Sequence, residues 1–275
     1  MYTLEVKNFD INQIARSGQC FRMSELDNGY WQIIAQDKCI MLRQTDSHIC
    51  FSCDDQEFRL FWQNYFDLDY DYGHAISTID AADTYLLQCA DFGNGIRILK
   101  QDLWEMLITF IISQNNNIPR IKSSVRKLCE YAGEKKSIYT GSIGENSPEI
   151  LEYHAFPTPE AIASIPVETL HSFGLGYRDE YLHLTSKKVA AGEFNLEILK
   201  DMPYEEATKT LMTLKGVGKK VADCVCLFGL HHIEAFPIDT HIKQILSEHY
   251  PDGFPFQKYE GYAGILQQYM FFAHL

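Results

Sequence analysis

A ten-residue segment with two glycines and three lysines is the part of the sequence best suited to chemistry. It runs Leu214-Lys-Gly-Val-Gly-Lys-Lys-Val-Ala-Asp223 and lies between two predicted helices. Gly216 and Gly218 permit positive φ and leave the backbone of the turn unobstructed. The N–H groups that open the second helix then face outward, and together with the helix dipole they attract a phosphate. A Gly-x-Gly turn alone also fits any ordinary helical hairpin.

Lys220 and Asp239 are the two candidate catalytic side chains of this region. Lys220 lies two residues after the second glycine, and Asp239 opens the next predicted helix 19 residues later. A neutral amine is a nucleophile whereas an ammonium is not, and lysine has an ordinary pKa of ~10.4. We therefore expect burial, together with Lys215 and Lys219, to lower the pKa of Lys220. Each residue alone also fits a common structural role, a solvated helix lysine or a helix N-cap.

The order of hairpin, lysine and aspartate resembles the helix–hairpin–helix DNA glycosylase superfamily, in which a lysine at this position marks the bifunctional members. In detail the chain is similar to the 8-oxoguanine DNA glycosylase/AP lyase family over nearly its whole length. The similarity is carried by Ser17–Arg22, Leu99–Asp102, Phe110–Asn117 with Arg120, Tyr153–Pro157, Leu175–Arg178, Lys220–Cys224, Pro237–His241, and Tyr262–Gly264 with Gln267 and Phe271. The departures from the family pattern remove no proposed functional group. They are Lys215 in place of a hairpin proline, and Cys20 and Pro119 in place of small residues.

The resemblance implies a DNA N-glycosylase (a hydrolase) with AP lyase activity, acting in base excision repair. Lys220 would attack the sugar C1′ while the glycosidic bond breaks, and the adduct would collapse to a Schiff base that permits β-elimination. Asp239, ionised at a helix N-terminus, would stabilise positive charge that builds on the sugar. The expected substrate is 8-oxoguanine in double-stranded DNA.

Base recognition is expected from parts that are far apart in the sequence. Cys224 lies one helical turn after Lys220, and Gln267 and Phe271 have the same spacing on the last predicted helix. The resemblance implies that Cys224 and Phe271 sandwich the extruded base while Gln267 reads its Watson–Crick edge. The carbonyl of Gly18 would accept the N7–H that 8-oxoguanine has and guanine lacks. Without the resemblance, core packing would be the preferred explanation of Cys224 and Phe271.

The same resemblance implies a set of contacts to the duplex, because base flipping leaves a hole in it. Asn115 would fill the hole, Tyr177 would wedge beside the estranged base, and Arg120 and Arg178 would contact the opposite cytosine. His241 is a candidate phosphate contact, with a surface histidine as the alternative.

No cofactor is expected. Related glycosylases hold an iron–sulfur cluster with four cysteines near the C-terminus, but no cysteine follows Cys226 here. Cys50 and Cys53 form the only C-x-x-C pair, and no second pair completes a zinc site, so we expect no metal ligands. Backbone carbonyls of the hairpin turn are a possible site for a monovalent cation by the same resemblance.

The hydrophobic pattern predicts an α+β fold. Residues 1–100 alternate apolar and polar in short runs, which predicts an N-terminal antiparallel sheet, with one helix at about 56–66. Residues 101–275 follow a helical period and form a mostly helical body that contains the helix–hairpin–helix at about 205–230. Asp102 is the expected N-cap of a helix over 103–113. Further helices are predicted near 119–132, 159–165, 167–173, 178–191, 240–249 and 259–272, and 134–157 is the least regular stretch.

The net charge of −13 argues against nucleic acid only if it is read globally. Two windows, 115–127 and 207–220, contain basic residues and no acid, so local binding of DNA is compatible with the composition. No apolar run approaches the ~20 residues that a membrane span needs, and we see no secretion signal. We therefore expect a monomer that binds lesion-containing double-stranded DNA and no membrane, in a bacterial cytoplasm or a eukaryotic nucleus.

Three alternatives remain open at this point. The chain could be a glycosylase of the same fold for an alkylated purine or a mismatched adenine. It could be a non-catalytic helix–hairpin–helix DNA-binding module, which the combination of Lys220 with Asp239 disfavours. The third alternative is an acidic protein-interaction domain, and the net charge alone supports it.

Overall fold

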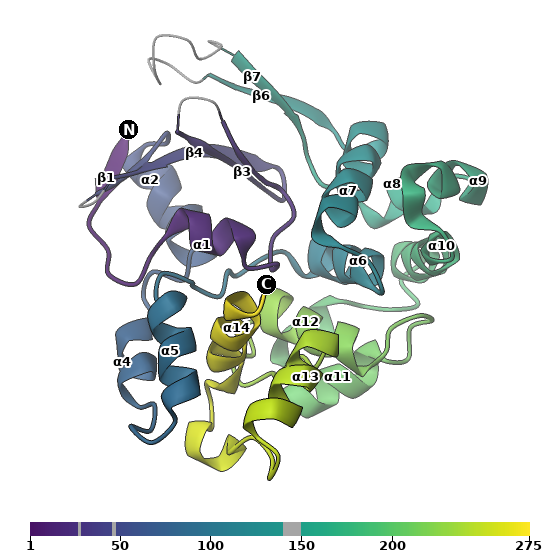
Figure 1. Cartoon of the computed structure of the whole chain (residues 1–275). Helices are drawn as coiled ribbons and strands as arrows, with labels where there is room; N and C mark the ends of the chain where they lie inside the picture. Colours follow the sequence, from purple (N-terminus) through teal and green to yellow (C-terminus); the bar gives the residue numbers. More distant parts are fainter. Residues whose placement is uncertain (27–28, 46–47, 140–149) are drawn as a thin grey trace.

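The computed structural model describes residues 1–26, 29–45, 48–139 and 150–275 and places a sheet on top of a helical body (Figure 1). The five strands are antiparallel in the order β1-β5-β4-β3-β2. Their bounds are β1 (Tyr2–Leu4), β2 (Met23–Glu25), β3 (Trp31–Ala35), β4 (Lys38–Gln44) and β5 (Ile49–Phe51). The N-terminal antiparallel sheet predicted from the alternating pattern is confirmed, and so is the helical body after it.

The sheet buries one face against helices from its own part of the chain. Trp31, Ile33 and Ala35 alternate with more exposed residues along β3, as the two-residue period of a strand requires. The covering helices are α1 (Ile11–Arg16) and a continuous helical run predicted near 56–66. This run consists of α2 (Asp55–Glu57), the π-helical turn η1 (Phe58–Trp62) and α3 (Gln63–Tyr65).

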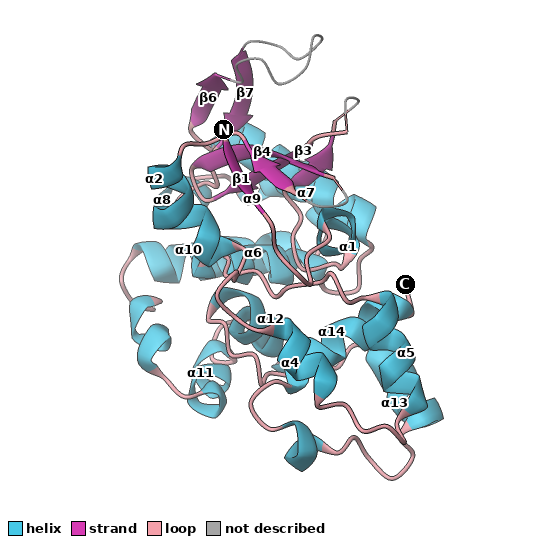
Figure 2. Cartoon of the chain, turned by 90° about the vertical axis from the view of Figure 1, so that its left-hand side faces the viewer, coloured by secondary structure: helices cyan, strands magenta, loops and turns pink. Residues whose placement is uncertain are grey.

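Three short helices among the first hundred residues were not predicted. They are α1, α4 (Tyr72–Ser77) and α5 (Thr84–Phe92), capped by the side chains of Asp10, Asp71 and Asp83. Six to nine residues give too few turns for a clear helical period. Helices α4 and α5 join the larger hydrophobic core, and α5 packs against the C-terminal helix α14 (Ala263–Ala273) (Figure 2).

The helical body follows the predicted order closely. Its remaining helices are α6 (Leu103–Ser113), α7 (Ile118–Ala132), α8 (Pro159–Ala163), α9 (Val167–Leu170), η2 (His171–Leu175), α10 (Arg178–Ala190), η3 (Glu197–Asp201), α11 (Tyr204–Leu211), α12 (Lys219–Gly229), α13 (Thr240–His249) and η4 (Phe256–Tyr259). Asp102 caps α6 by accepting the N–H of Glu105 at 2.8 Å, as predicted. Every residue of α6 except Ser113 is buried, and α6 packs along α12 at the centre of the body.

The stretch expected to be least regular contains a β-hairpin. Strands β6 (Lys135–Tyr139) and β7 (Ile150–His154) pair with each other, and 140–149 lie outside the described residues. The two strands are largely exposed, so the sequence lacks the apolar alternation that marks a half-buried strand. This part of the prediction is wrong.

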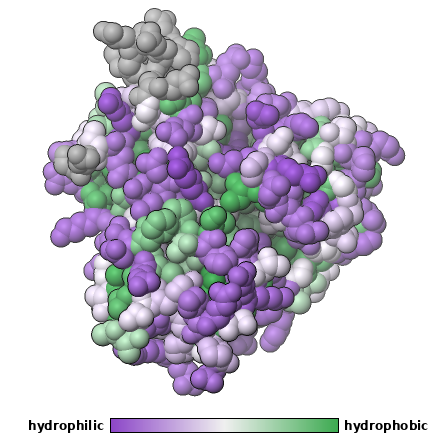
Figure 3. Space-filling view, viewed as in Figure 1, coloured by the Kyte–Doolittle hydropathy of each residue, from purple (hydrophilic) through white to green (hydrophobic). Residues whose placement is uncertain are grey.

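In the space-filling view, apolar side chains gather in the middle of the face and hydrophilic ones surround them (Figure 3). This position corresponds to the C-terminal end of α14 in Figure 1. Within the described residues, no helix is long and apolar enough to cross a membrane.

Candidate active site

The predicted hairpin is formed by α11, a short turn and α12. Glycine is present at its two turn positions for different structural reasons. Gly216 has φ +84°, and a Cβ placed there would lie 2.3 Å from the ring of Tyr181. Gly218 is the N-cap of α12 with φ −90°, and a Cβ there would meet nothing within 4 Å. The first glycine is therefore required by the fold, whereas a side chain at the second would have open space around its Cβ.

The predicted catalytic and base-recognition residues line one small cavity. Its walls include Lys220, Asp239, Gly18, Cys224, Gln267 and Phe271, together with Ser17, Phe110, Phe228, Pro237 and Gln268. They come from α12, α13, α14, α6 and the turn after α1, which are brought together only by the fold (Figure 1). The free space is about 40 Å³, which is room for a few water molecules and too little for a purine.

Lys220 stands in a largely apolar setting. Its Nζ lies 5.4 Å from the centroid of the Phe110 ring, on the buried helix α6. Cys224 is one turn further along the same helix and is 3% exposed. Burial raises the pKa of the Cys224 thiol to about 11, although the nearby Lys220 acts in the opposite direction. Cys224 is therefore a neutral, apolar wall of the cavity at physiological pH.

The two lysines expected to act on Lys220 are both paired with carboxylates. Lys215 Nζ lies 2.7 Å from Glu180, and Lys219 Nζ lies 2.9 Å from Asp223, which is 2% exposed. Their positive charges are largely offset by these partners. The neighbouring lysines therefore add little net positive charge around Lys220.

Asp239 and Gln267 also line the cavity, and backbone contacts hold both side chains. Asp239 caps α13 and accepts the N–H of Ile242 at 2.9 Å, so its carboxylate lies at a helix N-terminus. Gln267 is 4% exposed, and its Nε2 donates to the carbonyl of Pro237 at 3.2 Å. Its Oε1 is buried and has no hydrogen-bond partner among the described residues. An acceptor without a partner inside a cavity is suited to a donor on a ligand.

Phe271 and Gly18 close the cavity. The Phe271 ring lies against Gly18 so closely that a Cβ at Gly18 would be 3.1 Å from it, and Gly18 has φ +76°. His241 is exposed on α13, with its ring centroid 5.9 Å from that of Phe271. Its position at the rim of the cavity fits the predicted phosphate contact, which stays a prediction.

The residues predicted to contact the duplex lie around the start of α7 and α10. Asn115 and Arg120 are exposed, and Asn115 has φ +44°, a conformation that asparagine tolerates better than most residues. Tyr177 is 53% exposed, as a wedge requires. Arg178 differs from its prediction because it is 7% exposed.

The guanidinium of Arg178 is engaged with the backbone. It donates to the carbonyls of Leu175 and Asn115, each at 2.9 Å, and to that of Gln114. In this arrangement Arg178 holds the loop that presents Asn115. A contact with the opposite cytosine would require some of these hydrogen bonds to break.

Two family profiles match adjoining parts of the chain. The N-terminal domain of 8-oxoguanine DNA glycosylase matches residues 1–107, and the HhH-GPD superfamily base excision DNA repair protein matches residues 108–253. The chain belongs to the 8-oxoguanine DNA glycosylase family, within the HhH-GPD superfamily.

Relatives with solved structures cover nearly the whole of this family member. The 8-oxoguanine glycosylase/lyase of Clostridium acetobutylicum, in complex with double-stranded DNA containing cytosine opposite 8-oxoguanine, is 34% identical with a TM-score of 0.87. That match covers 98% of this chain and 92% of the other. The structure of MBOgg1 with a low-affinity DNA ligand is also 34% identical, with a TM-score of 0.89 and coverage of 98% and 93%.

A curated relative is longer than this chain. The N-glycosylase/DNA lyase of Saccharomyces cerevisiae is 40% identical over 167 residues, which are 57% of this chain and 42% of the yeast protein. The matched region therefore spans less than half the length of the yeast protein.

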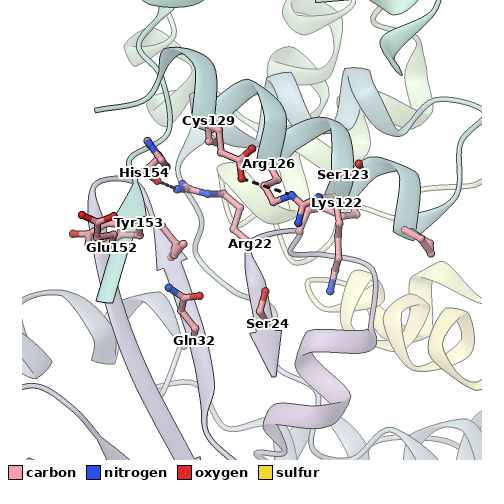
Figure 4. A pocket seen from close by; sticks show the side chains of 14 residues that line it. Arg22, Ser24, Gln32, Lys122, Ser123, Arg126, Cys129, Glu152, Tyr153 and His154 are labelled. Carbon is pink, nitrogen blue, oxygen red and sulfur yellow. Dashed lines mark hydrogen bonds and ion pairs between the residues drawn. The ribbon is translucent and has the colours of Figure 1, made fainter. Parts of the chain in front are cut away.

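A larger cavity of about 470 Å³ lies elsewhere in this glycosylase-family chain, between β2, β3, α7 and β7 (Figure 4). It contains none of the predicted site residues. At its inner wall Arg22 forms a 3.1 Å ion pair with Glu105, and both side chains are 5% exposed. Arg22 also donates to the carbonyls of Gln36 and His154. These contacts tie the sheet to α6 and to the hairpin, which is a structural role.

Sequence reasoning did not assign a role to Gln268, Tyr181 or Asp223. Gln268 lines the small cavity, Tyr181 packs on the hairpin glycine, and Asp223 holds Lys219. Only Asp223 carried a usable signal, since it follows Lys219 at the i,i+4 spacing of helical ion pairs. Among the described residues, no group of three or more His, Cys, Asp or Glu is arranged to hold a metal ion.

Proposed function

We propose that this protein is a bifunctional DNA glycosylase that removes 8-oxoguanine from duplex DNA and then cleaves the abasic site. The observation that carries the proposal is the convergence of Lys220, Asp239, Cys224, Gln267 and Phe271 on one cavity. A nucleophile, a carboxylate, an edge-reading amide and a stacking ring are the parts that excision of a flipped base requires. The name of the similar yeast protein supports the same pair of activities, and that of the Clostridium acetobutylicum enzyme supports the same substrate.

In the chemical step, the neutral amine of Lys220 forms a bond to the sugar C1′ as the bond from C1′ to the base nitrogen breaks. The electron pair of that bond leaves with the base, which takes up a proton. Opening of the sugar ring converts the adduct to an imine, which acidifies the C2′ proton. Loss of that proton expels the 3′ phosphate by β-elimination. Asp239 stabilises the positive charge on the sugar, because its carboxylate faces the same cavity.

The base must displace side chains to enter. The free space of about 40 Å³ is too small for a purine, and the ring of Phe271 rests on Gly18. Entry therefore requires the Phe271 ring to move away from Gly18, after which the base lies between this ring and Cys224. The unpartnered Oε1 of Gln267 then finds a donor on the Watson–Crick edge of the base.

The acidic chain binds DNA through local features. The open N–H groups at Gly218 and the dipole of α12 attract one phosphate, and the exposed Arg120 adds positive charge beside Asn115. We propose that the enzyme acts as a monomer, since one copy of the chain already brings together a nucleophile, a carboxylate and the base-recognition residues. Light scattering of the free enzyme and of its complex with a short duplex tests this point, and a dimer in both would contradict it.

A panel of lesion duplexes tests the proposed function. Duplexes with 8-oxoguanine, 3-methyladenine or adenine opposite guanine are incubated with the enzyme, and strand cleavage is followed on a gel before and after alkali. We expect cleavage of the 8-oxoguanine:cytosine duplex without alkali, since the lyase step cuts the strand. Release of an alkylated purine or of the mismatched adenine in preference to 8-oxoguanine would assign a different substrate. Binding without cleavage of any duplex would indicate a non-catalytic module.

A further inference from the structure

Ser17 and Gly18, in the turn Ser17-Gly18-Gln19, line the cavity, and the backbone of this turn alone presents the Gly18 carbonyl. Gly18 has φ +76°, a region that glycine adopts freely, and the Phe271 ring leaves no room for a side chain there. A glycine turn of this kind can rotate its peptide groups with little resistance. A carbonyl that must discriminate between two bases therefore needs to be fixed by its neighbours.

Both neighbouring carbonyls are fixed by buried glutamines. Gln268 on α14 donates its Nε2 to the carbonyl of Ser17 at 2.5 Å, and Gln101 donates its Nε2 to the carbonyl of Gln19 at 2.8 Å. Gln268 is 2% exposed and Gln101 is 7% exposed, so these contacts are shielded from water. The Gln19 side chain adds a third anchor by donating to Ser17 Oγ at 2.9 Å.

The Gly18 carbonyl belongs to the peptide group that lies between the two fixed ones. Once the carbonyls of Ser17 and Gln19 are held, the peptide group between them has little freedom to turn. We propose that Gln268 is a positioning residue for base recognition: by holding the Ser17 carbonyl it keeps the Gly18 carbonyl aimed at the N7–H of the flipped base. This inference rests on the proposed function.

Helix α14 then contributes to the cavity in three distinct ways. Gln267 presents an acceptor to the base, Phe271 supplies the stacking ring, and Gln268 fixes the turn on which that ring rests. Gln268 does not need to touch the base for this role. Its loss should therefore affect steps that depend on the base and spare steps that do not.

The test compares base excision with cleavage of a preformed abasic site in the same variants. Gln268→Met keeps a similar volume without a donor, and Gln268→Ala removes the donor without the risk of overpacking. Gln63→Met is the matched control. The Gln63 amide donates to Asp69 at 2.8 Å, so this variant also removes a side-chain donor, but Gln63 does not line the cavity. Single-turnover rates are measured with an 8-oxoguanine:cytosine duplex and with an abasic site opposite cytosine, and a melting temperature is recorded for each variant.

We expect both Gln268 variants to slow 8-oxoguanine excision by about five- to tenfold, the range for one lost hydrogen bond. Cleavage of the abasic site should stay within about twofold of the wild type, since it needs no base contact. Wild-type excision rates in both variants would overturn the inference. A parallel loss of excision and abasic-site cleavage would also overturn it, because it would indicate a general structural role. If the wild type itself excises no 8-oxoguanine, the proposed function fails instead.

Discussion

Replacing Gly216 by alanine separates the structural role of the hairpin from its role in DNA binding. The new Cβ would lie 2.3 Å from the Tyr181 ring, and the backbone at this position has φ +84°. The left-handed conformation costs an alanine about 1–2 kcal/mol, and overpacking against the ring costs about 1–3 kcal/mol more. We therefore expect Gly216→Ala to lower the free energy of unfolding by about 2–5 kcal/mol, which for a chain of this size lowers Tm by roughly 3–9 °C.

Gly218→Ala is the matched control, because its φ of −90° suits any residue and its Cβ would meet nothing within 4 Å. Its Tm should stay within about 2 °C of the wild type. Its Cβ projects from the open N-terminus of α12, so its affinity for duplex DNA should fall about three- to tenfold. Thermal unfolding and fluorescence anisotropy measure the two effects. A wild-type Tm for Gly216→Ala, or wild-type DNA affinity for Gly218→Ala, would refute this reasoning.

Three further predictions address the cavity, the DNA face and acid stability. Phe271→Ala should weaken binding of a lesion duplex by ~1–3 kcal/mol, the range for base–aromatic stacking, and unchanged affinity in anisotropy titrations would place the base elsewhere. Arg120→Glu should weaken both DNA binding and its salt dependence more than Lys187→Glu does, where Lys187 is an exposed residue of α10. Equal salt slopes for the two variants would count against the proposed DNA face. Burial of Asp67 favours its neutral form, but the hydrogen bond from His231 and other contacts outweigh this effect and lower its pKa below 3.8. Its contribution to stability is thus present above that pH and is lost on acidification, so Asp67→Asn should lower Tm at neutral pH and flatten the fall of Tm below about pH 4; an unchanged profile would contradict this.

The sequence was sufficient for the larger elements and insufficient for the short ones. Helices α6 and α13 have aspartate caps and enough turns for a clear period, and both begin and end where the pattern predicts. Helices α4 and α5 and the exposed strand β6 have too few residues, or too little buried surface, to leave a comparable signal. Tertiary packing determines such elements, and local sequence reflects it weakly.

Sequence motifs were enough to nominate the residues that the fold brings to the cavity, and the roles of these residues stay predictions. Lys220, Cys224 and Asp239 lie within one stretch of sequence, so their spacing is informative. The contact between Gln268 and Ser17 joins residues 251 positions apart, and no local pattern predicts it. The ion pair of Lys215 with Glu180 was likewise not predicted, because it joins residues 35 positions apart.

The acidic net charge does not by itself decide whether the chain binds DNA, because binding depends on the local field. Arg120 and Asn115 are both exposed at the proposed DNA face. Two of the acids, Asp67 and Glu105, are buried and paired with Lys100 and Arg22. The sum over the chain therefore leaves the partner undecided.

Covalent trapping with borohydride is the most direct test of the central claim, that Lys220 is the nucleophile. Reduction of the imine during turnover should yield a protein–DNA complex of wild-type enzyme that survives a denaturing gel. Lys220→Gln should bind the lesion duplex but should neither cut nor cross-link it. Lys219→Gln is the control, because Lys219 is adjacent in sequence yet is paired with Asp223 and does not line the cavity, so it should still trap. Trapping that persists in Lys220→Gln and disappears in Lys219→Gln would assign the reaction to the other lysine, and a wild type that never traps would contradict the imine mechanism itself.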